Sequence, residues 1–134
     1  QGYDKIAFSY GASWYKKIVK LKFSNETLRG AYGRFIVINE LYNSGIIEST
    51  HRVHLLGCQV PQEFGWYNNF SFIESLDTSN PVMAAIEGIR YKNYGLIDKP
   101  IANMNDSFDD LDEKLIIYNA KKFRKLNGFD PLSD

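Results

Sequence analysis

The sequence has little cysteine and no long apolar run. Its single cysteine, Cys58, cannot form a disulfide framework or a cysteine-rich zinc site within this chain. No apolar run approaches about 18 residues, so the sequence predicts no membrane-spanning helix. The first residues also lack a basic-then-apolar signal segment. We therefore expect a reduced, cytoplasmic compartment and no membrane partner.

The chain has no excess of either charge. Its 134 residues include sixteen basic and sixteen acidic side chains, which excludes a charge-driven disordered tail and an overall basic nucleic-acid clamp. The overall balance does not exclude local basic patches. An apolar content of 44% is enough for the core of one domain. Because strand-like residues follow Gln1 almost at once, residues 1–134 are expected to be a single domain or a fragment of a larger protein.

Apolar periodicity and turn residues divide the chain into alternating strands and helices. Strands are predicted near residues 5–10, 52–57 and 70–76. Helices are predicted near 14–21, from Ser24 or Asn25 to Gly45, over Pro61–Phe64 and Pro81–Glu87, and from a cap at Ser107 to Gly128. Gly30 and Gly33 weaken the long helix, but their missing side chains would allow close packing against a strand.

This rhythm is typical of parallel β/α units and predicts an α/β fold. Three parallel strands cannot close a barrel, and they would leave two open edges and an apolar sheet face. A full (β/α)8 barrel needs about 250 residues. The chain would then be a partial TIM barrel, made of the last three β/α units plus a C-terminal helix. The alternative is a small open sheet that is closed by dimerisation.

Functional residues of parallel α/β folds lie where the strands end. That rule selects residues 9–11, 57–59 and 77–80. Asp77 is the strongest candidate, because a carboxylate at the end of an apolar strand can act as a nucleophile, a general base or a metal ligand. The alternative is structural, since Asp77 begins an Asp-Thr-Ser-Asn-Pro sequence that would also cap the following helix.

Other reactive side chains suit structural roles better. Glu74 lies within the third strand and is expected to pair with a basic group. Cys58 is expected to be buried and inert, because His54 lies roughly 13 Å away along the same strand at about 3.3 Å per residue. His51 and His54 have no third ligand in reach by sequence, so no metal site is predicted.

No glycine-rich phosphate motif is present, and no nucleotide cofactor is expected. The last helix carries Lys121, Lys122, Arg124 and Lys125 near its end. These cations oppose the helix dipole and are typical of a solvated helix end, although they could also meet phosphates.

Three segments together resemble the C-terminal half of the tRNA-guanine transglycosylase superfamily. Residues 2–11 resemble the family's strand Gly-Phe-Asp-Gly-Tyr-Ala-Ile-Gly-Gly-Leu. Residues 54–57 and 61–64 resemble Tyr-Leu-Met-Gly and the Thr-Pro-Glu-Asp-Leu that follows it. Residues 72–79 stand where the family has Met-Phe-Asp-Cys-Val-Leu-Pro-Thr, and the spacing from Gly57 to Asp77 suits the family's nucleophilic Asp.

The resemblance implies a (β/α)8 barrel that exchanges guanine in tRNA or DNA for a 7-deazaguanine base. It assigns the nucleophile to Asp77, which would form a covalent glycosyl-enzyme. It assigns contacts with the base to the ends of the first two strands, at Ser9, Tyr10, Gly11, Leu56 and Gly57. Glycosidic cleavage passes through an oxocarbenium-like state that a carboxylate stabilises or traps.

The chain also departs from the family pattern. The zinc cluster of three Cys and one His is absent, and the second catalytic Asp belongs to the family's N-terminal half. In these departures the chain resembles divergent relatives of the family, often carried by phages, that place deazaguanines in DNA. The missing half-barrel or a second copy is the expected protein partner. Two alternatives remain, which are a non-catalytic half-barrel that binds or scaffolds and a different (β/α)8 enzyme for a sugar or phosphate substrate.

Overall fold

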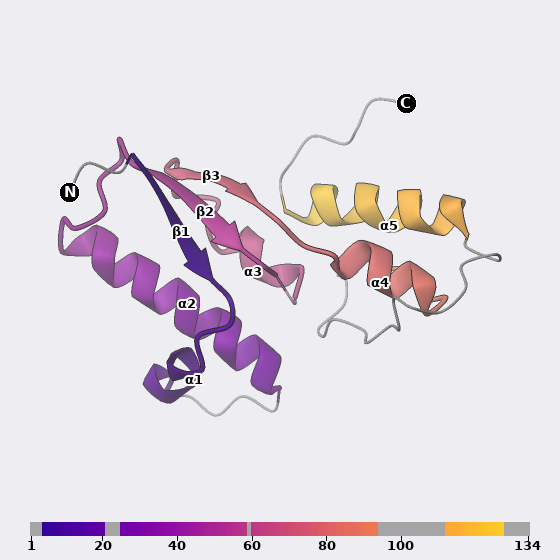
Figure 1. The fold of residues 1–134 in the computed structure, drawn as a ribbon, viewed down its shortest axis with the longest axis horizontal. Helices are drawn as coiled ribbons and strands as arrows, with labels where there is room; N and C mark the ends of the chain where they lie inside the picture. Colours follow the sequence, from indigo (N-terminus) through magenta and orange to yellow (C-terminus); the bar gives the residue numbers. More distant parts are fainter. Residues whose placement is uncertain (1–3, 21–24, 59, 94–111, 128–134) are drawn as a thin grey trace.

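The computed structural model describes residues 4–20, 25–58, 60–93 and 112–127. Its centre is a sheet of three parallel strands in the order β1-β2-β3 (Figure 1). The strands are β1 (Lys5–Ser9), β2 (Arg52–Leu56) and β3 (Ile73–Leu76). The predicted α/β class and the parallel strands are therefore confirmed, and every predicted strand is present.

Five helices accompany the sheet. They are α1 (Trp14–Ile18), α2 (Glu26–Asn43), α3 (Gln62–Gly65), α4 (Asn80–Ile86) and α5 (Glu113–Leu126). None of the helices described in the structure has the length and apolarity that crossing a membrane requires.

Side-chain caps and a glycine fix the helix ends that matter for the fold. Asn25 begins α2, because its side chain accepts a hydrogen bond of 2.8 Å from the backbone N–H of Leu28. Gly45 ends the same segment with a φ of 79°. Asp112 caps α5 by accepting from the N–H of Leu115. The cap predicted at Ser107 lies outside the described residues.

The third strand is shorter than predicted. It begins at Ile73 instead of residue 70, and Phe70 and Phe72 belong to an aromatic cluster beside the sheet. The ring of Phe72 stacks on Tyr42 with centroids 4.9 Å apart, and that of Phe70 meets Phe35 at 6.2 Å. Phe70 lies in a turn, where its carbonyl accepts from Ile73 N at 3.2 Å, whereas the Phe72 carbonyl still accepts a 2.8 Å hydrogen bond from Val53 N of β2.

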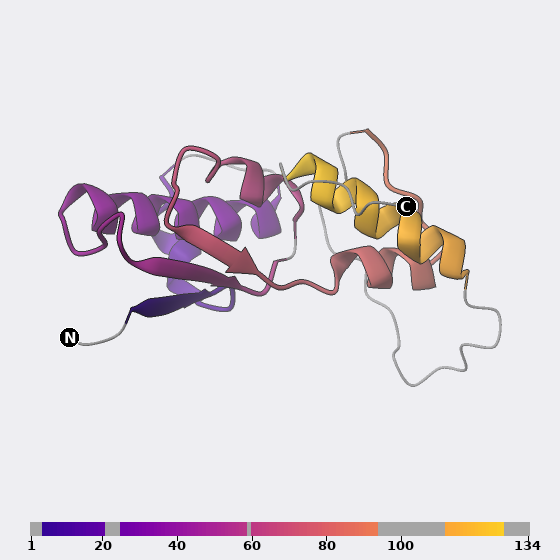
Figure 2. The same ribbon diagram turned by 90° about the horizontal axis from the view of Figure 1, so that it is seen from above.

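Within the described part of the chain, helices cover only one face of the sheet. Figure 2 shows α2 and α3 on this side, where the buried Val53 and Leu55 meet the core together with Ile6 and Phe8. The opposite face carries Lys5, Ala7, Ser9, Arg52, His54, Leu56 and Glu74. The prediction of an open apolar face is therefore wrong. Alternation along each strand places the apolar set against the helices and leaves a mostly polar face uncovered.

The α4–α5 pair lies beyond the carboxyl end of β3 and does not return alongside the sheet (Figures 1 and 2). Buried Asn119 of α5 connects the pair, since its amide accepts from Tyr91 N and donates to the carbonyl oxygens of Ile89 and Pro81. Phe123 of α5 meets Phe64 of α3 at 5.7 Å between ring centroids, which joins the pair to the core. The described residues form a three-stranded α/β unit and do not by themselves close a barrel.

The long helix meets α1 closely at Gly33, and not a strand as the sequence predicted. A β-carbon at Gly33 would lie 2.7 Å from the carbonyl carbon of Tyr15 and still closer to its oxygen. At Gly30, one turn earlier, the nearest atom would be the Tyr10 hydroxyl at an ordinary 3.5 Å. Only Gly33 is therefore required by the contact between the two helices.

This difference predicts opposite effects for two identical substitutions. Gly33→Ala should destabilise the protein by about 1–3 kcal/mol, because backbone atoms of Tyr15 must move. Gly30→Ala should be neutral or stabilising by up to about 1 kcal/mol, since alanine favours the helix. Urea unfolding followed by circular dichroism measures both, and equal stabilities for the two variants would contradict the predicted contact.

Candidate functional site

The carboxyl ends of the three strands meet at one edge of the sheet. Ser9 pairs with Leu56, and Tyr10 N donates a 2.9 Å hydrogen bond to the Leu56 carbonyl. Asp77 N donates to the carbonyl of Leu55 at 3.3 Å. All six predicted site residues therefore lie along this edge, which we call the carboxyl edge. They are Ser9, Tyr10, Gly11, Leu56, Gly57 and Asp77.

The carboxylate of Asp77 is held by β2 and the turn after it. Its Oδ1 accepts a 2.8 Å hydrogen bond from Gly57 N, and its Oδ2 lies 2.9 Å from His54 Nε2. Gly57 has a φ of 70°, a conformation that glycine adopts without steric cost. The side chain of Asp77 is 53% exposed and so remains open to a ligand.

Asp77 does not cap the following helix, so the structural alternative is wrong. Ser79 occupies the N-cap position of α4, without a side-chain cap. The turn is instead held by Thr78, whose hydroxyl donates to the Cys58 carbonyl at 2.8 Å and accepts from Asn80 N at 3.0 Å. The Thr78 hydroxyl therefore stabilises the turn before α4, a role that the sequence had suggested for the Asp77 carboxylate.

His54 contacts the candidate carboxylate, which the sequence analysis did not predict. Its Nδ1 lies 2.7 Å from Ser75 Oγ, so Ser75, His54 and Asp77 form one hydrogen-bonded line. An ionised carboxylate only accepts, which assigns the ring proton to Nε2 and leaves Nδ1 to accept from the Ser75 hydroxyl. Parallel pairing places His54 opposite Ser75. Knowledge of the strand register would therefore have predicted this contact.

A serine hydrolase uses the same three residue types in line. Such an enzyme also needs backbone N–H groups that stabilise the oxyanion. Here the N–H of Gly57 already donates to Asp77, and Ser75 lies within β3. The line is therefore better suited to orienting the Asp77 carboxylate than to activating Ser75.

The site keeps Asp77 ionised. The hydrogen bond with His54 is the largest cause that lowers the pKa of this carboxyl. Partial burial is the second-largest effect and opposes it, while the N–H of Gly57 and the positive charge of Arg34 lower the pKa further. An ionised and accessible carboxylate can act as a nucleophile or as a base at neutral pH.

A buried ion pair lies beneath the carboxyl edge. Arg34 of α2 and Glu63 of α3 are both 0% exposed, and they share two hydrogen bonds of 2.6 and 2.7 Å. The remaining Arg34 donors reach three carbonyl oxygens, each at 2.9 Å, which belong to Phe8, Leu56 and Gly57. One side chain thus ties both helices to the ends of β1 and β2.

The surrounding groups keep the Arg34–Glu63 pair charged and hydrogen-bonded. Burial opposes the charged form of Arg34, but the Glu63 carboxylate raises the pKa of the guanidinium overall. Burial raises the pKa of the Glu63 carboxyl, an effect that the hydrogen bonds from Arg34 and Tyr67 oppose. Sequence periodicity places Arg34 on a helix but does not reveal its buried partner.

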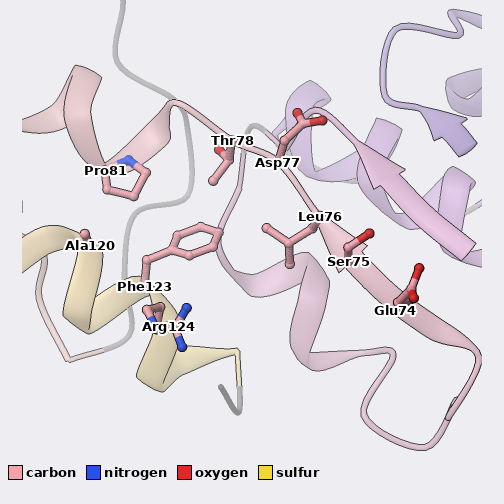
Figure 3. Close-up of a pocket in the computed structure, with 9 residues that line it drawn as sticks. All are labelled: Glu74, Ser75, Leu76, Asp77, Thr78, Pro81, Ala120, Phe123 and Arg124. Carbon is pink, nitrogen blue, oxygen red and sulfur yellow. The ribbon is translucent and has the colours of Figure 1, made fainter. Parts of the chain in front are cut away.

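The predicted base-contacting residues do not share one cavity with Asp77. Tyr10 turns toward α2, where its hydroxyl donates to the Thr27 carbonyl, and burial raises its pKa to about 12. Tyr10 and Gly11 line a pocket of about 300 Å³ beside α1 and α2. Asp77 lies instead at the rim of a cleft of about 500 Å³ between β3 and α5 (Figure 3).

Apolar side chains form the middle of the Asp77 cleft. Leu76 and Phe123 lie there, with Asp77 on one side and Arg124 of α5 on the other (Figure 3). Glu74 forms a further part of the wall and pairs with Lys5 at 2.8 Å and Arg52 at 3.7 Å. The predicted pairing of Glu74 with basic groups is confirmed.

The other reactive side chains have structural partners. Cys58 is buried, as predicted, and its thiol donates to the Val60 carbonyl. His51 lies apart from His54 and accepts from Glu48 N. Among the described residues, no group of three or more His, Cys, Asp or Glu side chains is arranged to hold a metal ion.

Comparisons with protein-family models, with curated proteins and with solved structures find no match to this chain. The assignment of a function therefore depends on the geometry of the carboxyl edge and on the resemblance of the three sequence segments.

Removal of Arg34 should be costly. Arg34→Met leaves Glu63 as an unpaired buried charge and should destabilise the protein by about 3–5 kcal/mol in urea unfolding. Arg34→Met/Glu63→Met removes that charge and should recover part of the loss, although three carbonyls stay without a donor. The control Arg52→Met affects an exposed pair and should cost at most about 1 kcal/mol. An Arg34→Met protein as stable as this control would refute the role of the pair.

The lowered pKa of Asp77 predicts an acid-dependent contribution to stability. Because the folded-state pKa lies below the ordinary 3.8, the contribution is full above that value and is lost as the pH falls through the lowered pKa. The difference in melting temperature between wild type and Asp77→Asn should therefore stay constant at higher pH and shrink as the pH falls below 3.8. His54→Gln removes the main cause and should flatten this dependence. An unchanged pH dependence in His54→Gln would contradict the assignment.

Proposed function

We propose that this chain is part of a base-exchange transglycosylase that replaces guanine in DNA or tRNA with a 7-deazaguanine. The observation that carries the proposal is the Asp77 carboxylate, ionised and half-exposed at the carboxyl end of a parallel strand. That position is where parallel α/β enzymes present reactive groups. The resemblance of residues 2–11, 54–64 and 72–79 to the transglycosylase superfamily gives the reaction class.

In the proposed reaction, Asp77 attacks the anomeric carbon of a guanosine. A bond forms between a carboxylate oxygen and that carbon, the glycosidic C–N bond breaks, and guanine leaves with the electron pair and one proton. A nitrogen of the deazaguanine then attacks the same carbon, loses its proton and releases Asp77. His54 and Gly57 orient the carboxylate, and their hydrogen bonds keep it ionised before the attack.

The proton for the departing guanine comes from an acid outside this chain. We assign that acid to the partner that completes the barrel, either the N-terminal half-barrel or a second copy. The uncovered face supports such a partner, because it carries the polar set of Lys5, Arg52 and Glu74 across all three strands. A buried half-barrel interior can accommodate such charges only as pairs, which is how they occur here.

The same proposal gives the neighbouring residues their roles. Leu56, which is 44% exposed, would form an apolar wall beneath the base. Ser9, Tyr10, Gly11 and Gly57 would contact the base from the ends of the first two strands. Because Tyr10 points toward α2, its backbone would make that contact instead of its hydroxyl. The reaction would take place in the cytoplasm, where both nucleic-acid substrates are found.

The test is base exchange by the protein expressed from its full natural reading frame. Wild type should incorporate labelled guanine into DNA or tRNA and form a covalent protein–nucleic acid adduct that survives denaturation. Asp77→Asn keeps the shape but not the nucleophile, so both signals should fall at least about a hundredfold. Glu74→Gln is the matched control, because it removes a carboxylate that lines the same cleft but is already paired with Lys5 and Arg52, and it should retain exchange and the adduct.

Four results would overturn the proposal. Exchange by Asp77→Asn at the wild-type rate would show that Asp77 is not the nucleophile. An adduct mapped to Glu74 would assign the nucleophile to Glu74 instead. A wild-type protein that binds a deazaguanine without exchange or adduct would be a non-catalytic binding protein. Release of a sugar or phosphate product without base exchange would instead indicate a different (β/α)8 enzyme.

A further inference from the structure

One face of α5 carries a line of cations. Four lysines and one tyrosine recur at spacings of three and four, which places them on the same side of the helix. They are Lys114, Tyr118, Lys121, Lys122 and Lys125. We call this set the basic stripe. The acidic side chains of α5 are confined to its beginning, at Asp112 and Glu113. The chain as a whole is neutral, so this surface is a local concentration of positive charge.

The segment before the undescribed residues 94–111 adds a further cation to the stripe. The guanidinium carbon of Arg90 lies 3.5 Å from the centroid of the Tyr118 ring. Tyr118 donates its hydroxyl proton to the Tyr91 carbonyl at 3.2 Å, and Lys122 donates to Asn93 Oδ1 at 3.0 Å. The contact with Tyr118 places the Arg90 guanidinium beside the stripe and adds its positive charge to this surface.

A shallow pocket lies within the stripe. Its volume is about 210 Å³, and its lining consists of Tyr118, Lys121, Lys122 and Lys125. Lys121 and Lys125 are one turn apart, about 6 Å along the helix axis. Three lysine side chains and one aromatic ring line this pocket, so cationic side chains and an apolar surface lie together at one place.

We propose that the basic stripe binds the phosphate backbone of a single-stranded stretch of nucleic acid. Lysine side chains neutralise phosphates, and a guanidinium plane or an aromatic ring can stack with an unpaired base. An anionic membrane would also attract the charge, but a membrane-binding helix needs a free apolar face. Phe123 of α5 is only 4% exposed and belongs to the core, and the 53% exposed Ile117 is a single apolar side chain and not a free apolar face.

The stripe lies across α5 from the Asp77 cleft. Ala120, Phe123 and Arg124 face that cleft from the same helix, so one helix diameter, about 10 Å, separates the two surfaces. Binding by the stripe does not require base exchange, and the two proposals can be tested separately.

The experiment measures the fluorescence anisotropy of a labelled single-stranded oligonucleotide of about 20 nucleotides, at salt concentrations from about 50 to 200 mM. Lys121→Gln/Lys125→Gln should weaken binding by about tenfold at about 100 mM salt. The slope of log K against log salt should become less steep by about 1.4, or about 0.7 for each phosphate that is no longer neutralised. The matched control Lys17→Gln/Lys20→Gln makes the same charge change at exposed positions near α1 and should weaken binding by less than about twofold.

Further measurements separate the alternatives. Asp77→Asn should retain wild-type affinity for the oligonucleotide. The exchange activity of this variant therefore tests only the proposed function, and its affinity tests only the basic stripe. Undetectable binding by wild type, or equal losses in the two lysine variants, would overturn the proposal. Binding to phosphatidylserine vesicles without binding to the oligonucleotide would assign the stripe to a membrane surface and would also reject it.

Discussion

The buried guanidinium of Arg34 is the constraint on which the carboxyl edge depends. It has five hydrogen bonds, two to Glu63 and three to carbonyl oxygens at the ends of β1 and β2. A charge without contact with water is tolerated only when its donors are all satisfied. The two strand ends must therefore stay at fixed positions relative to α2 and α3, which makes this edge the most rigidly specified part of the sheet.

Gly57 passes that constraint on to the candidate site. Its carbonyl accepts from Arg34, and its N–H donates to Asp77. A single residue thus connects the buried pair with the exposed carboxylate, and its positive φ directs both backbone groups to their partners. The orientation of Asp77 is consequently set by the core and not by the loop that follows β3. Preorganisation of this kind is what a nucleophilic carboxylate needs, because reorientation during the reaction would add to the barrier.

The sequence predicted the parts of the structure that depend on local patterns. Strand ends, the Asn25 cap and the glycine that ends α2 each have a signal within a few residues. The position of Asp77 follows from the rule about parallel strands. Two features had no such signal. The Arg34–Glu63 pair joins residues 29 positions apart on two helices, and the His54–Asp77 contact depends on register, which the bulge between Val53 and His54 shifts. The polar uncovered face could have been predicted from alternation, had the apolar set been assigned to the helix side.

In the proposed function, the placement of α4 and α5 would connect base exchange at Asp77 with recognition of a nucleic-acid substrate. In a simple β/α unit, the helix after β3 would return along the sheet and leave the end of the strand open. Here the pair continues beyond that end, so α5 forms the far wall of the Asp77 cleft through Phe123 and Arg124. The same helix carries the basic stripe on its other side. A nucleoside within a polymer must be bound through its neighbours as well as at its own glycosidic bond, because the bond alone supplies too few contacts to select it. One helix that borders both the cleft and a cationic surface meets this requirement, and it does so in a chain whose net charge is zero.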